Sequence, residues 1–271
     1  MLRIKNLRIN ISQHLRATIA SYRIMSGNES QKHGFTWEHK IILNVFRVSD
    51  DIRRKIKYTA KMDLPAALNK LDGCDVSIKT TGSPNTVCMG DCLRVYDSIC
   101  SNKPLHLVVV IYKQDDVNNR KKLIEIIQVD ITGLKGKLFG GITREEIEEL
   151  VNAVKRVPHD RKPTAEEHKA MFDIQKIVQE KSCAIYLNIK CDSKQSRLQC
   201  SFNKFLEFIE RNPDKIIARS KTNEFRGGVI PMELESGRRA RKKKCAPTST
   251  IEPTPAPTST PTPTESTISQ E

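Results

Sequence analysis

The fold of this chain depends most on one stretch, which reads DGCDVSIKTTGSPNTVCMGD from Asp72 to Asp91. Two runs of residues that favour strands flank a cluster of turn formers, Gly82-Ser83-Pro84-Asn85. This pattern is typical of a β-hairpin. The stretch therefore predicts two paired strands joined by a short turn.

The first strand of this expected hairpin has an apolar and a polar face, because side chains alternate between the two sides of a strand. Val76 and Ile78 share the apolar face, while Asp75 and Lys79 share the polar face. Asp91 ends the second strand and falls near them if the hairpin pairs in register. Carboxylates that converge near a lysine can hold a divalent metal ion and activate a water. A polar face that is merely solvated explains the same residues, and the stretch alone leaves both readings open.

A helix is expected before this stretch, from Thr36, which can cap it, to about Phe46. Glu38 falls on the same face as Ile41 and Val45, because residues three and seven positions apart share one side of a helix. An acid on a core-facing side is costly unless it is paired or binds a metal. A glutamate in the first turn also interacts favourably with the helix dipole, and this second reading stays open.

The rest of the chain has the patterns of an α/β (α+β) protein, with a mixed central sheet flanked by helices. Asp63 is expected to cap a short helix that has Pro65 in its first turn. The later elements are a helix at 91–100, strands at 106–112 and 122–131, helices at 144–156 and 165–181, a hairpin at 184–202 and a helix at 203–211. Glu125 is a reserve candidate for a metal ligand, and an outward glutamate on an edge strand is the alternative.

The total charge is the strongest global signal. The 271 residues carry a formal net charge of +14, with 38% hydrophobic and 5% aromatic residues. This length supports one or two domains with a substantial core. A polyanion is the first partner to consider, with nucleic acid ahead of a membrane surface. Basic tails alone give the same total, so the position of the charge matters.

The eight cysteines have no C-x-x-C pair, so they are expected to be reduced thiols in an intracellular protein. A zinc site formed by Cys88, Cys92 and Cys100 is the alternative. No apolar run reaches the roughly 18 residues of a transmembrane helix, so no membrane partner is expected. The chain also has no P-loop, G-x-G-x-x-G, H-E-x-x-H or G-x-S-x-G motif.

Composition divides the chain into four parts. These are a basic N-terminal extension (1–33), an α/β core (34–157), a helix and hairpin subdomain (158–236), and a basic run with a tail rich in Pro, Thr and Ser (237–271). The first 25 residues imitate a mitochondrial transit peptide, or Met25 is the true start. The run Arg238–Lys244 is typical of a nuclear-import signal or of non-specific nucleic-acid binding. The tail that follows is expected to be disordered.

The hairpin expected at 184–202 has a polar periphery that is suited to nucleic acid. Such side chains contact phosphates, and Gln or Arg can also read base edges. A charged hairpin tip in water is the alternative. The candidate nucleic-acid-binding residues are Lys190, Lys194, Gln195, Arg197 and Gln199.

An acid on a first helix, an acid and a lysine on a following hairpin, and then a helix and an apolar strand occur in this order within residues 34–131. This order resembles the core of the PD-(D/E)XK nucleases, especially the type II restriction endonucleases. Glu38, Asp75, Lys79 and Asp91 carry the resemblance. In that family the aspartate normally lies on the strand before the lysine, and a second acid normally stands where this chain has Ser77.

The resemblance implies a nuclease-like core with Asp75, Asp91 and Glu38 as ligands of Mg²⁺. Lys79 would then polarise or deprotonate the attacking water and stabilise charge at the phosphate. The departures from the family pattern leave two readings. Either Asp91 serves as the second acid, or the site does not catalyse.

The expected function is that of a Mg²⁺-dependent endonuclease that cleaves double-stranded DNA, as a homodimer if the target is palindromic. A non-catalytic DNA-binding protein on a nuclease-like fold is the first alternative. A protein-interaction factor with basic tails is the second.

Overall fold

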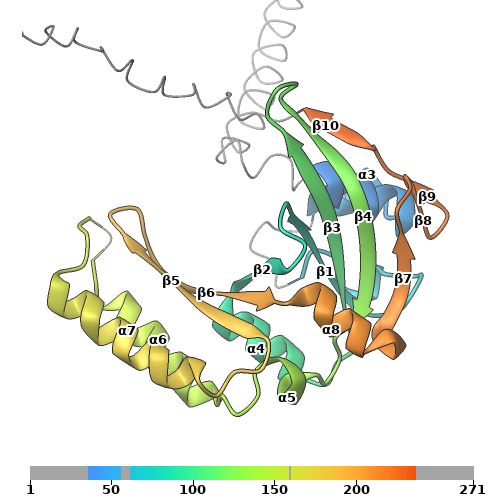
Figure 1. The fold of residues 1–271 in the computed structure, drawn as a ribbon. Coiled ribbons are helices and arrows are strands. Elements are labelled where there is room, and N and C mark those ends of the chain that lie inside the picture. Colours follow the sequence, from blue (N-terminus) through green and yellow to red (C-terminus); the bar gives the residue numbers. More distant parts are fainter. Residues whose placement is uncertain (1–35, 56–61, 159, 236–271) are drawn as a thin grey trace, which may run out of the picture. The chain divides into compact units, whose positions relative to one another are not determined.

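The two longest strands contain long apolar runs with several β-branched residues each. In the computed structural model, which describes residues 36–55, 62–158 and 160–235, β3 (Leu105–Asp115) and β4 (Arg120–Asp130) form a long antiparallel pair (Figure 1). The transit-like N-terminus, the alternative start at Met25, the run Arg238–Lys244 and the Pro/Thr/Ser tail lie outside the described residues.

A five-stranded mixed sheet is built on this pair. Strand β1 (Asp75–Thr81) lies parallel to β3. On the other side, β4 pairs antiparallel with β7 (Ile216–Ser220) and, nearer the β3–β4 turn, with β10 (Glu233–Glu235). The predicted α/β (α+β) class, with a mixed central sheet flanked by helices, is confirmed.

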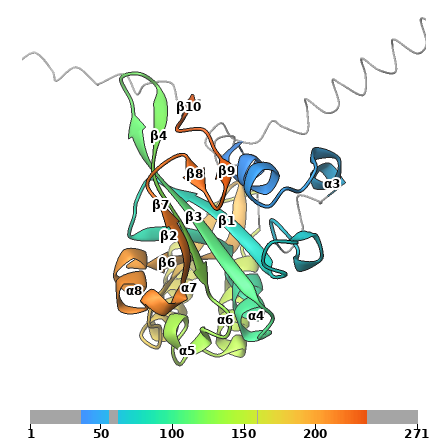
Figure 2. The ribbon, with the colours of Figure 1, turned by 90° about the vertical axis from the view of Figure 1, so that its right-hand side faces the viewer.

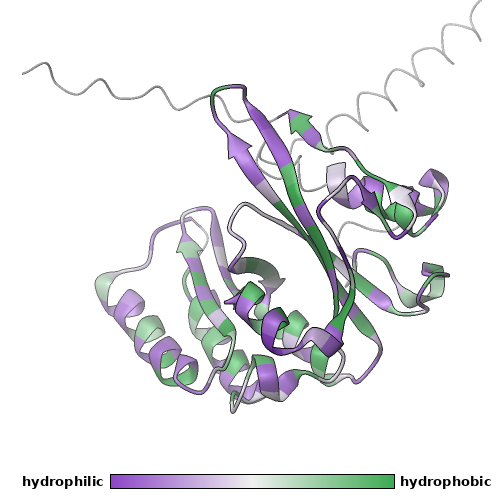
Figure 3. Cartoon of the chain, turned by 45° about the vertical axis from the view of Figure 1, so that its right-hand side comes forward, coloured by the Kyte–Doolittle hydropathy of each residue, from purple (hydrophilic) through white to green (hydrophobic). Residues whose placement is uncertain are grey.

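Alternation along β3 separates two hydrophobic cores, because neighbouring side chains point to opposite faces of the sheet. Leu107 and Val109 belong to the larger core, which α4 to α8 and the second sheet complete. Val108 and Val110 belong to the smaller core, which the N-terminal helical segment covers. Hydrophobic residues follow β3 and β4 through the sheet, whereas their shared turn is hydrophilic (Figure 3).

The second sheet has the order β2-β6-β5 and packs with the helices of the larger core. The predicted hairpin at 184–202 is confirmed as β5 and β6. The helices predicted at 144–156 and 165–181 are confirmed as α6 and α7, and capping boxes at Thr143 and Thr164 begin them. The bounds are β2 (Thr86–Asp91), β5 (Ile185–Asp192), β6 (Gln195–Asn203), α4 (Cys92–Cys100), α5 (Lys135–Leu138), α6 (Arg144–Lys155), α7 (Ala165–Gln179) and α8 (Phe205–Arg211).

The N-terminal helical segment is confirmed near its predicted bounds. Residues 36–40 are α-helical and continue into the π-helix η1 (Ile41–Val45). This segment lies beside the small hairpin of β8 (Glu224–Phe225) and β9 (Gly228–Val229) (Figure 2). The remaining short elements are α3 (Asp50–Lys55), η2 (Ala66–Leu68) and η3 (Pro213–Lys215).

The predicted hairpin of residues 72–91 is wrong. Strand β1 joins the central sheet beside β3, whereas β2 pairs antiparallel with β6. The two strands separate because their apolar faces belong to different cores: Val76 and Ile78 to the smaller one, Val87 and Met89 to the larger one. Burial in these cores outweighs the local preference for a hairpin.

Both main sheets cross the domain boundary that was predicted near residue 158. Strand β6 pairs with β2, and β7 and β10 pair with β4, so each sheet contains strands from both predicted parts. All described residues belong to one compact unit within Met1–Ala240.

Candidate functional site

Asp63, which the sequence patterns predicted only as a helix cap, lies beside Lys79. Leu64 forms an isolated antiparallel bridge with Val76, which brings Asp63 alongside β1. The Asp63 Oδ2 atom accepts hydrogen bonds from the Ile78 backbone N–H at 2.6 Å and from Lys79 Nζ at 3.0 Å. Ser77 Oγ also donates to it at 3.2 Å. The backbone and two side chains of β1 therefore fix the Asp63 carboxylate.

Asp63 and Asp75 have roles different from those predicted for them. The expected helix cap at Asp63 is wrong, because Pro65 occupies the N-cap position of η2 and makes no side-chain cap. Instead, the Ala66 backbone N–H donates to Asp75 Oδ1 at 2.7 Å. Asp75 therefore fixes the start of η2, and Asp63 is the acid next to Lys79.

Glu38 interacts electrostatically with Asp63 and Lys79, and we call these three residues the Glu38 cluster. Its side chain is 18% exposed, and Arg53 Nη2 on α3 lies 3.9 Å from Glu38 Oε1. The pKa of Glu38 is raised to about 7. Burial is the main cause and the negative charge of Asp63 is the second, while the positive charges of Lys79 and Arg53 lower the pKa. The three residues come from a helix, a bridge segment and a strand, and they interact electrostatically at one place.

Of the predicted site residues, Glu38 and Lys79 belong to this cluster through their electrostatic interaction, and Asp91 has another role. Asp91 is the N-cap of α4 and accepts a hydrogen bond from the Arg94 backbone N–H at 2.9 Å. Its expected convergence with Lys79 across a paired hairpin is wrong, because β2 belongs to the other sheet. The reserve candidate Glu125 is buried and accepts two hydrogen bonds from Arg219, so it is neither a free ligand nor an edge residue.

Asp63 was missed because a single bridge leaves no periodic signal in the sequence. A strand is recognised from alternation over several residues, and only Leu64 pairs here. The proline that follows also imitates the start of a helix. The family pattern offered the one available signal, an aspartate on a segment that precedes the strand of the lysine.

The candidate nucleic-acid residues lie on the β5–β6 hairpin. Lys190 and Arg197 are cross-strand partners and both are exposed. Lys194 is exposed at the turn, while the Gln195 side chain donates to Asp192. Gln199 pairs in register with Asp91 on one side of β6 and with Asn188 on the other. The hairpin thus offers cations to solvent, and Gln195 supports its own turn.

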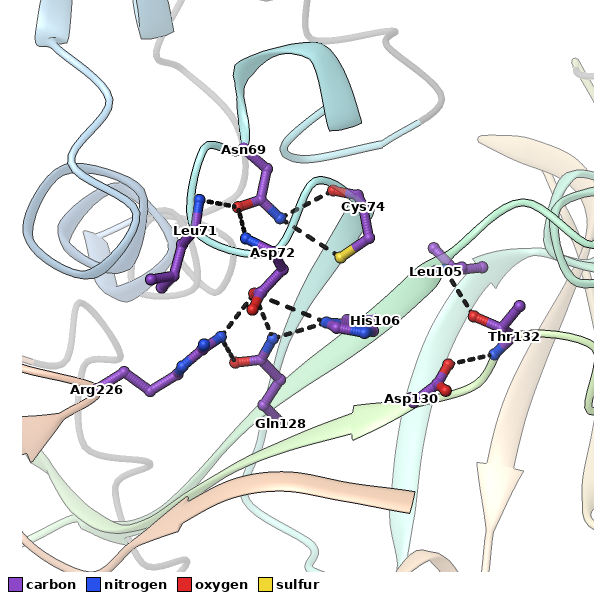
Figure 4. A network of polar contacts seen from close by, with 10 residues as sticks. All are labelled: Asn69, Leu71, Asp72, Cys74, Leu105, His106, Gln128, Asp130, Thr132 and Arg226. Atoms are coloured by element: carbon purple, nitrogen blue, oxygen red, sulfur yellow. Dashed lines mark hydrogen bonds and ion pairs between the residues drawn. The ribbon is translucent and has the colours of Figure 1, made fainter. Parts of the chain in front are cut away.

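A second cluster lies where β1 begins. Asp72, Cys74 and His106 each offer one ligand atom, and these atoms lie within 4.8 Å of one another (Figure 4). Carboxylate, thiolate and imidazole are all common metal ligands, so this group can hold a metal ion. Among the described residues it is the one such group of three. We call it the Cys74 cluster.

Neighbouring polar groups hold the carboxylate of this cluster. Burial acts to raise the pKa of Asp72, but hydrogen bonds from Arg226 and Gln128 bring it below its usual value. Arg226 Nη1 lies 2.6 Å and Gln128 Nε2 lies 3.0 Å from Asp72 Oδ2. For Cys74, burial is the main cause that raises the pKa to about 11, followed by the negative charge of Asp72.

Comparison with protein-family models, curated proteins and solved structures finds no match to this chain. Among the described helices, none is both long and apolar enough to span a lipid bilayer.

Proposed function

We propose that this chain is a Mg²⁺-dependent endonuclease that hydrolyses phosphodiester bonds of double-stranded DNA. The observation that carries the proposal is the Glu38 cluster, in which two carboxylates and a lysine interact on separate elements. The arrangement supports the resemblance to the PD-(D/E)XK nucleases. In the proposed site Asp63 takes the role that the sequence assigned to Asp75 and Asp91. These two residues therefore have no part in the proposed site.

The two carboxylates suit a hard divalent cation. Mg²⁺ is usually bound by one or two carboxylates and keeps several waters, so Glu38 and Asp63 are a sufficient protein contribution. The pKa of Glu38 is raised first by burial and then by the negative charge of Asp63, and a bound cation would oppose both effects. Bound Mg²⁺ would supply a nucleophilic water and neutralise charge on the phosphate.

Lys79 is placed to act on the scissile phosphate. Its Nζ atom donates to Asp63 Oδ2 at 3.0 Å and to the Ile78 carbonyl oxygen at 3.2 Å, which fixes the ammonium on β1. A cation held in advance stabilises negative charge that develops in a transition state without reorganisation. Lys79 is thus the group that stabilises negative charge on the phosphate and polarises the attacking water.

DNA is the favoured substrate because of charge. The chain has a net charge of +14, and the exposed pair Lys190 and Arg197 presents cations on the second sheet. Neutralised phosphates release counterions, so such contacts favour DNA at moderate salt. A palindromic target would be matched by a homodimer.

A non-catalytic DNA-binding protein is the second candidate, and Ser77 favours it. Ser77 stands where the family normally has a second acid, and it donates to Asp63. The Asp63–Lys79 ion pair also satisfies both charges without a metal. DNA would then bind with or without Mg²⁺ and remain intact.

The test uses plasmid DNA of different methylation states, with Mg²⁺ or with a chelator. The proposal expects discrete fragments only with Mg²⁺, and a fall in cleavage rate of at least about 100-fold for Asp63→Asn, because the electrostatic stabilisation is lost. Asp91→Asn is the matched control. Asparagine caps a helix as well as aspartate, so this variant should cleave like the wild type.

Uncut DNA under every condition, with duplex binding intact, would support the non-catalytic alternative. Cleavage that survives Asp63→Asn but not Asp91→Asn would instead restore the hairpin interpretation of the site.

A further inference from the structure

We propose that Asp72, Cys74 and His106 form a binding site for Zn²⁺ that is independent of the Glu38 cluster. They offer a carboxylate oxygen, a sulfur and an imidazole nitrogen, all within 4.8 Å of one another. Zn²⁺ takes such mixed ligands in sites with three protein ligands and an open fourth position. Mg²⁺ prefers oxygen ligands, whereas the thiolate of Cys74 suits Zn²⁺. The Glu38 cluster and the Cys74 cluster are therefore expected to bind different metals.

The loop that carries two of the ligands is held in shape by Asn69, which is 2% exposed. Asn69 Nδ2 donates to the Cys74 carbonyl oxygen at 2.9 Å and contacts Cys74 Sγ at 3.4 Å. Asn69 Oδ1 accepts from the Asp72 backbone N–H at 3.1 Å (Figure 4). A hydrogen-bonded shell of this kind orients ligands before a metal arrives.

The His106 nitrogen that faces the cluster is a hydrogen-bond acceptor. Gln128 Oε1 accepts from Arg226 Nη1 at 2.9 Å, which directs the amide nitrogen of Gln128 toward Asp72 and His106. This nitrogen lies 3.0 Å from Asp72 Oδ2 and 2.9 Å from His106 Nδ1. A carboxylate can only accept, so Gln128 is the donor, and the lone pair of His106 Nδ1 accepts from it. A metal ion bound at this nitrogen would displace the Gln128 hydrogen bond.

Arg226 now occupies the place of a cation beside Asp72. Its Nη1 atom lies 2.6 Å from Asp72 Oδ2, and the Asp72 and Arg226 side chains are only 10% and 19% exposed. A metal ion at Asp72 would compete with this guanidinium for the same carboxylate. The Arg226 contact therefore lowers the affinity of the site for Zn²⁺, and removal of the arginine charge should increase this affinity.

The backbone at Arg226 allows this charge to be removed cleanly. Arg226 and Gly227 join β8 to β9 with φ values of 50° and 76°. Positive φ at both positions is typical of a type I′ turn, in which asparagine is preferred at the first position. Arg226→Asn thus removes the cation while it keeps or improves the turn.

The experiment titrates the reduced, metal-free full chain with Co²⁺ as a spectroscopic probe and then displaces it with Zn²⁺. The wild type should bind one equivalent with a thiolate-to-cobalt charge-transfer band, and Zn²⁺ should remove the band. Cys74→Ser should abolish the band. Cys88→Ser, which changes an exposed cysteine, should leave it unchanged.

Arg226→Asn distinguishes a metal site from a purely structural ion-pair network, because loss of an ion pair from a network that binds no metal gives no tighter site in the folded chain. We expect its Zn²⁺ affinity to rise by about tenfold or more, the scale of a lost charge-assisted hydrogen bond. The proposal is overturned if the wild type shows no thiolate band, if Cys74→Ser keeps it, or if Arg226→Asn binds Zn²⁺ no more tightly. None of these results depends on DNA cleavage.

Discussion

At Glu38 the chain places a carboxylate where burial and the negative charge of Asp63 both oppose ionisation, so its pKa rises to about 7. A cation that binds between these acids would relieve both effects, and Lys79 and Arg53 already do so in part. Residues that destabilise the folded state in this way are characteristic of functional sites. The pH dependence of the free energy of unfolding therefore measures the raised pKa of Glu38, and this measurement needs no substrate.

We expect the metal-free protein to lose stability as the pH rises from about 4.5 to 7. The folded pKa of Glu38 is above its ordinary value of 4.5, so the folded state holds this proton over a range in which the unfolded state releases it. The contribution is fully present below about 4.5 and lost above about 7. Its size is on the order of 2–3 kcal/mol. Urea unfolding in chelator at several pH values measures it.

Glu38→Gln should remove this pH dependence, because glutamine does not titrate. At pH 8 the variant should be more stable than the wild type, and at pH 4.5 the two should be similar. Glu149→Gln, on the exposed side of α6, is the control and should leave the curve unchanged. Equal stability of Glu38→Gln and the wild type at pH 8 would contradict the raised pKa.

At this scale local rules account for the positions of Glu38 and Lys79 but not for that of Asp63, and the catalytic roles of these residues stay predictions. Helical spacing places Glu38 on a core-facing stripe, and alternation places Lys79 on the polar face of β1, so both follow from local rules. Asp63 depends on one bridge to a strand that begins eleven residues after Leu64. No local pattern encodes such a contact.

At the scale of elements, the position of Glu38 depends on the fit between η1 and the β8–β9 hairpin. A Cβ atom on Gly228 would lie 2.5 Å from the carbonyl oxygen of Asn44, within η1. Trp37 Nε1 donates to the Pro231 carbonyl oxygen at 3.0 Å from the same helical segment. The segment that carries Glu38 is therefore fixed by backbone contact with the C-terminal part of the described chain.

Gly228→Ala should destabilise the protein by about 1–3 kcal/mol, the usual cost of overpacking a filled space. It should also lower cleavage, because the clash moves the segment that carries Glu38. Chemical unfolding and the plasmid assay measure the two effects.

Gly136→Ala is the control: its Cβ would meet nothing within 4 Å, and the helical position favours alanine by about 0.4–1 kcal/mol. If both variants unfold like the wild type, the fit at Gly228 is looser than the geometry indicates.

The elements that the sequence predicted best are those with a strong local signal. The helices predicted at 144–156 and 165–181 are α6 and α7, whose capping boxes at Thr143 and Thr164 are a local signal. The strand predicted at 106–112 is part of β3, whose apolar run is buried. The prediction of a hairpin at 72–91 is wrong because alternation indicates which side chains share a face of a strand. It does not indicate which hydrophobic core that face joins. For the same reason the sequence did not show that strands from both sides of residue 158 pair in each main sheet, since packing decides which distant strands pair.

At the scale of the whole molecule, charge should govern DNA affinity separately from cleavage. The run Arg238–Lys244 holds six cations, a large share of the net charge of +14. The hairpin cations Lys190, Lys194 and Arg197 are a second source, on the described part of the chain. Each phosphate contact contributes about 0.9 to the slope of log affinity against log salt.

Replacement of all six cations of this run by glutamine in the full chain should weaken duplex binding and lower the salt slope by up to about five. Fluorescence anisotropy at several salt concentrations measures the slope. The metal requirement and the cleavage positions should not change, because the Glu38 cluster remains intact.

Replacement of Lys190, Lys194 and Arg197 by glutamine is the companion variant, with a slope change of at most about three. If only the companion variant lowers the slope, DNA contacts the second sheet rather than the run. If neither variant does, both predicted DNA-binding surfaces are wrong.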